Sequence, residues 1–140
     1  MTGDDEVLVW QKDTWGSYGQ HHNIYTFVID PETLEVKPIY ELVTTRYEKK
    51  DSSKNYHRFT YVKLSELKEK LRNKVLKMVD DHKSSRNRRV TVKYYLVTEN
   101  GLEELKADQG LKDSNGFYDK IELDDRILIV RKDKVEVIKK

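Results

Sequence analysis

The stretch with the clearest binding chemistry is the basic and aromatic run TRYEKKDSSKNYHRFTY at residues 45–61. Cationic side chains can track phosphates and aromatic rings can stack on bases, which is how proteins hold single-stranded nucleic acids. The residues that would do this here are Arg46, Tyr47, Lys49, Lys50, Lys54, Tyr56 and Arg58. A structural interpretation is also open, in which the rings belong to the core and the cations to a solvated loop, because tyrosine is a favoured strand residue.

A second basic cluster lies farther along the chain, in the connection KSSRNRR at residues 83–89. Because arginine can bind phosphate in a bidentate manner, we expect a phosphate-binding loop formed by Arg86, Arg88 and Arg89. Cations on the exposed face of a preceding helix would extend the same charge, namely Lys70, Lys74 and Lys77. The alternative is a charged surface that only keeps a tyrosine-rich protein soluble.

Aromatic residues and histidines share a glycine-containing loop, DTWGSYGQHH at residues 13–22. Exposing large rings to water in a polar loop is unfavourable unless the rings are packed or used for binding. The residues that could form a binding loop here are Trp15, Tyr18, His21 and His22. The two histidines are adjacent and would point to opposite faces of a strand, so they would not readily chelate one metal ion. We favour the interpretation that Trp15 plugs the end of the core.

The sequence contains none of the diagnostic catalytic motifs: no P-loop, no HExxH and no glycine-flanked serine elbow. Nucleases commonly arrange carboxylates around a divalent ion. The residues that could serve such chemistry are His57, Glu41, Asp80 and Asp81. A salt bridge to Arg86 or Arg88 explains the adjacent aspartates more simply than catalysis does. We therefore predict no cofactor and no metal ion.

The element that must position these groups is predicted to be an amphipathic helix in LSELKEKLRNKVLKM, residues 64–78. Its apolar residues recur at steps of three and four and so share one helical face: Leu64, Leu67, Leu71, Val75 and Met78. We expect this main helix to run over about residues 65–82. At 1.5 Å per residue, a helix over residues 64–78 would separate the two basic clusters by about 20 Å.

The remainder of the chain is typical of strands and turns. We expect strands at residues 6–11, 23–30, 35–47, 56–63, 90–99, 121–123, 126–131 and 135–139, and an irregular segment at 107–116. Tight turns are predicted at residues 30–33 and at Asn100–Gly101. The predicted fold class is α+β, a single domain over 1–140 with a frayed tail at 1–5, in which a predominantly antiparallel sheet of about 7–8 strands packs on one main helix.

The composition bounds the function in other ways. The 27 Lys and Arg residues nearly balance the 25 Asp and Glu residues, so local patches must account for any nucleic-acid binding. The lack of cysteine excludes thiolate zinc sites and favours a reducing, cytoplasmic location. No apolar run is long enough to span a membrane. Abundant Lys, Glu, Arg and Tyr favour a thermophilic archaeon, or one of its viruses or plasmids, as the source.

Three functional hypotheses agree with these observations. The first, which we favour, is a non-enzymatic accessory protein that binds DNA or RNA. The second is a protein-interaction module, for instance a virus- or plasmid-encoded inhibitor of a host complex, and the third is a metal-dependent nuclease or phosphodiesterase. An exposed strand edge, at the strand that contains Pro38 or at the closing hairpin, could also pair with a second copy of the chain.

Overall fold

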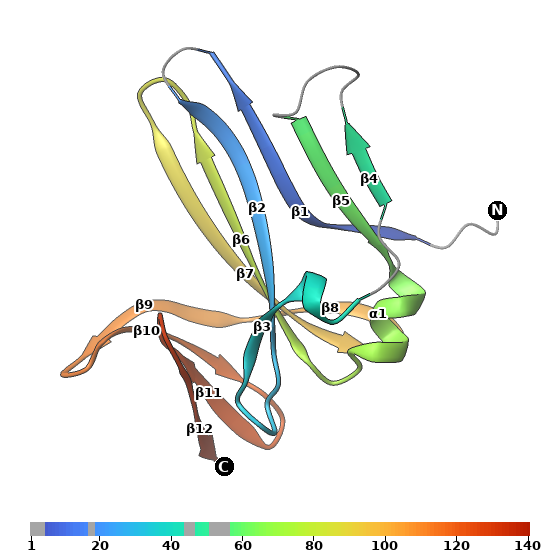
Figure 1. The fold of residues 1–140 in the computed structure, drawn as a ribbon. Coiled ribbons are helices and arrows are strands. Elements are labelled where there is room, and N and C mark those ends of the chain that lie inside the picture. The colour runs from blue at the N-terminus through green and yellow to red at the C-terminus, as the bar shows by residue number, and fades with distance from the viewer. Residues whose placement is uncertain (1–4, 17–18, 44–46, 51–56) are drawn as a thin grey trace.

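The computed structural model describes residues 5–16, 19–43, 47–50 and 57–140, with only the backbone described at 47–50. The described chain forms two antiparallel sheets and a single α-helix (Figure 1). The α+β fold class with a predominantly antiparallel sheet is therefore confirmed. Strands are more numerous than predicted, and they form two sheets.

The first sheet has the strand order β4-β5-β1-β2-β6-β7-β8, with β3 paired to β2 off this path. Its strands are β1 (Glu6–Trp15), β2 (Gln20–Ile29), β3 (Val36–Pro38), β4 (Tyr47–Lys50), β5 (His57–Lys63), β6 (Val75–Lys83), β7 (Arg88–Thr98) and β8 (Gly101–Leu105). The second sheet has the order β12-β11-β10-β9. Its strands are β9 (Ala107–Asp113), β10 (Gly116–Glu122), β11 (Arg126–Val130) and β12 (Val135–Lys139).

Two hydrophobic cores lie on opposite faces of the first sheet. One lies beneath the helix α1 (Leu64–Lys70) and the 3-10 turn η1 (Ile39–Glu41), and its buried residues are Val9, Val28, Ile39, Val43, Val62, Leu67, Leu71, Leu76 and Val97. The other lies between the two sheets, and its buried residues are Ile29, Val75, Tyr94, Ile121, Leu128, Val130 and Val135. The central strands β2 and β6 thus contribute to both cores, as predicted for residues 23–30 from their apolar character.

The predicted helix over residues 65–82 is wrong beyond Lys70, because the chain turns and continues as β6. The reversal includes Asn73, whose φ of 69° is left-handed and ends the helical path. Backbone pairing then begins, since the amide of Asn73 donates to the carbonyl of Val97 over 2.8 Å and the amide of Val97 donates to the carbonyl of Lys74 over 3.0 Å. The helical spacing of Val75 and Met78 is therefore a coincidence inside a strand.

Two further predictions are wrong in extent. The strand expected at 35–47 ends at Pro38, which has no amide to donate to a ladder, and η1 follows it. The segment at 107–116, expected to be irregular, contains β9 and the start of β10 around a two-residue turn. In that turn the carboxylate of Asp113 accepts a hydrogen bond of 2.9 Å from the amide of Asn115.

The predicted turns are confirmed. At residues 30–33 the carboxylate of Asp30 accepts hydrogen bonds from the amides of Glu32 (2.8 Å) and Thr33 (3.3 Å). The Asn100–Gly101 turn joins β7 to β8. In the described part of the chain, no helix has the length and apolar character needed to cross a membrane.

Candidate nucleic-acid interface

The first sheet extends well beyond its cores, and its free end carries polar side chains. The β1–β2 and β6–β7 hairpins form this end, which we call the distal end, on the side away from α1 and the second sheet (Figure 1). All four histidines of the sequence lie near it: His21 and His22 on β2, His57 on β5 and His82 on β6. Residues that pair across strands share a face, so the register assigns each side chain to one of two faces.

One of these faces is basic. The register pairs Arg58 with Lys12 across β5 and β1, Thr14 with His21 across β1 and β2, and Lys83 with both His21 and Arg88. Side chains two residues apart on a strand point to the same face, so Phe27 lies on the same face as His21. Lys77 pairs with Phe27 and therefore shares this face. We call it the basic face; on β1, β2, β5, β6 and β7 it carries Lys12, Arg58, Lys77, Lys83 and Arg88.

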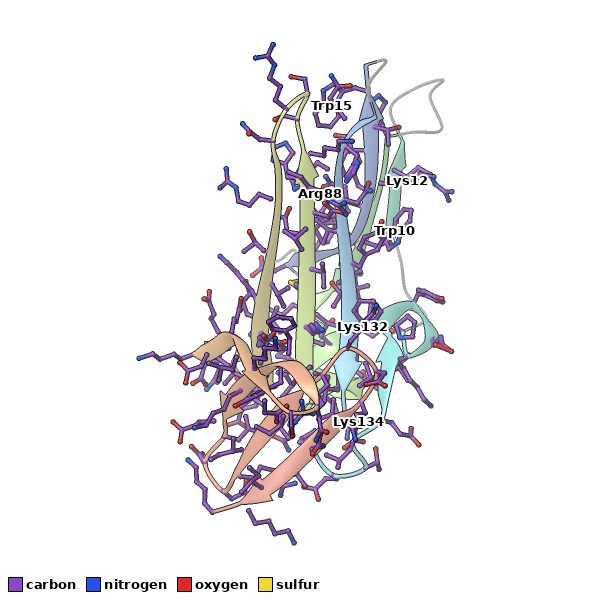
Figure 2. The ribbon with its side chains drawn as sticks, turned by 90° about the vertical axis from the view of Figure 1, so that its left-hand side faces the viewer. Trp10, Lys12, Trp15, Arg88, Lys132 and Lys134 are labelled. Atoms are coloured by element: carbon purple, nitrogen blue, oxygen red, sulfur yellow. The ribbon has the colours of Figure 1, made fainter. Side chains whose placement is uncertain are left out.

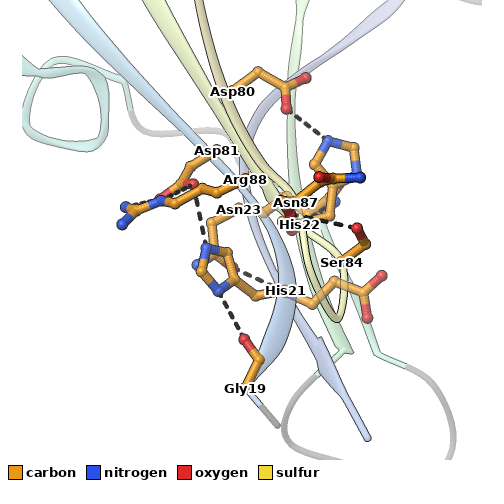
Figure 3. Close-up of polar contacts among 11 residues, drawn as sticks. Gly19, His21, His22, Asn23, Asp80, Asp81, Ser84, Asn87 and Arg88 are labelled. Carbon is orange, nitrogen blue, oxygen red and sulfur yellow. Dashed lines mark hydrogen bonds and ion pairs between the residues drawn. The ribbon is translucent and has the colours of Figure 1, made fainter.

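The basic face also carries the carboxylate of Asp81, which contacts Arg88 and His21. Arg88 donates to it in a bidentate manner, with Nε–Oδ1 of 3.0 Å and Nη2–Oδ2 of 2.8 Å, and Nε2 of His21 lies 3.3 Å from Oδ1 (Figure 3). The hydrogen bonds from Arg88 hold the pKa of Asp81 below its usual value. The salt bridge that the sequence suggested between this aspartate and Arg88 is confirmed.

The opposite face of the distal end, which we call the histidine face, has balanced charge. His22 Nε2 lies 2.8 Å from Asp80 Oδ1, and the imidazole of His22 stacks on that of His82 with 4.7 Å between ring centroids. On the same face His57 Nδ1 contacts the carboxylate of Asp13. The prediction that His21 and His22 point to opposite faces is confirmed, because each pairs with a different member of the Asp80–Asp81 pair.

The predicted phosphate-binding loop of Arg86, Arg88 and Arg89 does not form as expected. Arg88 and Arg89 are consecutive residues of β7, so they point to opposite faces, whereas the prediction placed both in the short connection at residues 83–89. Arg89 pairs in register with His82 and belongs to the histidine face. Arg86 is exposed in the turn between β6 and β7.

The lysine row predicted on the exposed helix face is wrong, because only Lys70 belongs to α1. Lys70 donates to Glu66 over 3.0 Å, and Lys74 forms an ion pair of 3.1 Å with Asp30. Lys77 lies in β6 and belongs to the basic face. The three lysines therefore do not form one surface.

The first basic run is described in part. Arg46, Lys54 and Tyr56 lie outside the described residues, and Tyr47, Lys49 and Lys50 lie in β4, where the backbone alone is described. Arg58 is described fully, and its guanidinium lies 5.9 Å from the ring centroid of Trp10. For this run, the structural evidence therefore rests on Arg58.

Trp15, the last residue of β1, does not plug the end of the core, so that prediction is wrong. Trp15 is 41% exposed at the distal end, with its ring centroid 6.2 Å from that of His82. Tyr18, the other ring of the predicted binding loop, lies outside the described residues.

The four weak catalytic candidates are not brought together. Asp80 and Asp81 point to opposite faces of β6, Glu41 is exposed in η1, and His57 pairs with Asp13. Among the described residues, no group of three or more His, Asp or Glu side chains could hold a metal ion. The edges proposed for a homodimer exist as edges among the described strands, where β3 pairs with β2 alone and β12 borders the second sheet.

Sequence reasoning missed several residues of the basic face. Trp10 lies in the strand predicted at residues 6–11, and Lys12 lies just beyond it in β1. The turn between β11 and β12 adds Lys132 and Lys134 beside this face. These two lysines line a hollow with Phe27 and Lys77, next to the basic face. Figure 2 shows Lys12, Trp10, Lys132 and Lys134 following one another down this side of the molecule, with Arg88 beside them.

Comparison with protein-family models, curated protein sequences and solved structures found no match to this chain. The interpretation of the basic face therefore rests on its own geometry and charge.

Proposed function

We propose that the protein is a non-enzymatic nucleic-acid-binding accessory protein that contacts the phosphate backbone through its basic face. The observation that supports this is the asymmetry of charge between the two faces of the first sheet. On β1, β2, β5, β6 and β7 the basic face has five cations and one carboxylate, Asp81, in the rows from Phe27 to the distal end. In the same rows of the histidine face, Arg89 and Lys93 are balanced by Asp13 and Asp80.

Several cations of the basic face are available to a ligand. Lys12 is exposed, Lys77 and Lys83 are half-buried, and none of the three forms an ion pair with a described residue. Lys132 extends the track onto the second sheet. Lysine ammonium groups that are not committed to a carboxylate can replace the counterions condensed on a phosphate backbone, which is the main source of affinity in non-specific binding.

A salt titration of two matched triple variants tests this proposal. Binding of a labelled single strand of about 12 nucleotides would be followed by fluorescence anisotropy, a length within the range of known site sizes. The first variant replaces Lys12, Lys77 and Lys83 with Gln. The control removes the same charge from other surfaces by replacing Arg89, Lys93 and Lys106 with Gln, all of which are exposed.

The basic-face variant should flatten the dependence of log K on log salt by about 2, because each phosphate contact on a single strand contributes about 0.7 to the slope. The control should keep the wild-type slope. Wild-type protein that fails to bind at low salt, or a control that weakens binding as much as the basic-face variant does, would contradict the proposal.

A further inference from the structure

A pocket of about 400 Å³ opens within the basic face, between η1 and strands β1, β2 and β5. It is lined by Val9, Trp10, Tyr25, Thr26, Phe27, Pro38, Ile39, Tyr40, Val43, Arg58 and Thr60. Trp10 pairs in register with both Tyr25 and Thr60, which places these three residues side by side. Its volume is that of a small-molecule or single-nucleotide site. We call it the aromatic pocket.

The lining combines aromatic surface with one cation. Four aromatic rings line the pocket, those of Trp10, Tyr25, Phe27 and Tyr40. The ring of Tyr40 is large and mostly apolar, yet this residue is 55% exposed. Exposed rings gathered at one place mark a contact surface more often than scattered ones do. Arg58 lies over Trp10, so its guanidinium is held as a planar stacking surface.

The charge around the pocket favours an anionic ligand. The lining includes Arg58 and no carboxylate. Lys12 pairs in register with Arg58 beside the pocket, and Lys77 pairs with Phe27 at its other side. An occupant with a flat ring and phosphates on both sides would match the rings at the centre and the cations at the margins.

We infer that the aromatic pocket takes one unpaired base of a nucleic-acid strand whose flanking phosphates lie on Lys12 and Lys77. This inference rests on the proposed function and narrows it to single strands, because a base held in a duplex cannot enter a pocket between rings. Stacking between the rings and the base would add to the affinity without adding a phosphate contact.

The test uses a single strand that contains one 2-aminopurine, whose fluorescence is quenched by stacking, together with a duplex and a free mononucleotide. Tyr25→Ala and Tyr40→Ala remove exposed rings of the pocket and so spare the core. The matched control, Phe117→Ala, removes a ring that is 67% exposed in the second sheet.

Each pocket variant should lose at least about fivefold in affinity for the single strand and reduce the quenching, since one stacked base is worth about 1–3 kcal/mol. The salt slope should stay at its wild-type value, because no cation is lost. Duplex affinity should not change, the free nucleotide should bind more weakly than the strand, and Phe117→Ala should match the wild type in every measurement.

Failure of this inference differs from failure of the proposed function. If strand and duplex both fail to bind at low salt, the proposed function is wrong and the inference falls with it. If the strand binds with the Lys12-dependent slope but the two pocket variants behave like Phe117→Ala, only the base pocket is wrong. A free mononucleotide that binds as tightly as the strand would also overturn the inference, because the ligand would then be a nucleotide.

Discussion

Removing the hydroxyl of Tyr94 should destabilise the protein although the ring remains. Tyr94 is fully buried in β7, and its phenol donates a hydrogen bond of 2.5 Å to Asp119 Oδ2 on β10. The bond joins the first sheet to the second. Phe keeps the apolar surface buried, so the change in Tyr94→Phe isolates this one hydrogen bond.

The expected loss follows from the kind of bond and its exposure. A hydrogen bond to a charged group is worth about 1.5–3 kcal/mol. Asp119 is half-buried, so water can partly replace the lost donor and the lower value applies. Tyr94→Phe should therefore lower the free energy of unfolding by about 1.5 kcal/mol. At about 2–4 °C per kcal/mol, the melting temperature should fall by about 5 °C.

Urea unfolding followed by circular dichroism provides the measurement, and the adjacent Tyr95→Phe provides the control. Tyr95 points to the opposite core, and its hydroxyl has no hydrogen bond to a described residue. A double-mutant cycle with Asp119→Ala should show coupling between the two side chains. A loss below about 0.5 kcal/mol for Tyr94→Phe, or a loss equal to that of Tyr95→Phe, would refute the reasoning, since surface-like effects are of that size.

The same bond has a signature at high pH. Burial, and then the hydrogen bond to Asp119, raises the pKa of the Tyr94 phenol above its ordinary value. The unfolded chain loses this proton near pH 10 while the folded chain keeps it. The contribution of this phenol to the free energy of unfolding is therefore fully present below about pH 10. It is lost as the pH rises further, because the folded state then binds more protons than the unfolded state. Tyr94→Phe should lack this part of the alkaline loss.

Two further predictions concern Asp81 and Asn73. The pKa of Asp81 is lowered chiefly by its hydrogen bonds from Arg88, so the pair stabilises the fold above the unfolded-state pKa and stops doing so as the pH falls through the folded-state pKa. Asp81→Asn should consequently lower the urea midpoint more at pH 7 than at pH 2. Asp133→Asn, at an exposed site without an ion pair to a described residue, should have no effect at either pH. Because Asn73 has a left-handed φ, Asn73→Ala should cost about 1 kcal/mol and Asn73→Gly less than about 0.5 kcal/mol in thermal unfolding. Arg72→Ala, at the neighbouring exposed site, should resemble the wild type, and equal losses for Ala and Gly at position 73 would contradict the strain argument.

The strands and turns that were predicted correctly depend on local chemistry. Asp30 caps its own turn with its side chain, and Asn100–Gly101 suits a hairpin whatever the rest of the chain does. The central position of β2 was also readable, because a strand that is apolar on both faces must be covered on both.

The helix was overestimated because a distant strand decides where it ends. The backbone of Val97 forms hydrogen bonds with the backbone of Asn73 and of Lys74, just after the helix. Nothing in the sequence of residues 64–78 indicates this distant partner. Val75 is buried as a strand residue, so it satisfied a helical pattern without being helical. Tertiary pairing outweighed local periodicity.

The basic face was beyond sequence reasoning for a different reason. Lys12, Arg58 and Lys83 come from three distant segments and share a face only in the observed register. A slip of one residue would move a whole strand's side chains to the other face. The same argument explains why Arg88 and Arg89 looked like one cluster in the sequence and lie on opposite faces in the fold.

The shared use of β2 and β6 by the two cores has a consequence for how the molecule unfolds. Val28 and Ile29 on β2 are consecutive and lie in different cores, as do Val75 and Leu76 on β6. Opening either core would displace β2 and β6 and so expose buried residues of the other core. Both cores should therefore unfold in a single cooperative transition. The buried core residues of β1, β2, β6 and β7 lie in the halves away from the hairpin turns, and they are Val9, Val28, Ile29, Val75, Leu76, Tyr94 and Val97. Partial opening would then be confined to the distal ends of the hairpins. Such an arrangement would let the surface proposed to bind nucleic acid fluctuate while amide protons in the cores stay protected from exchange.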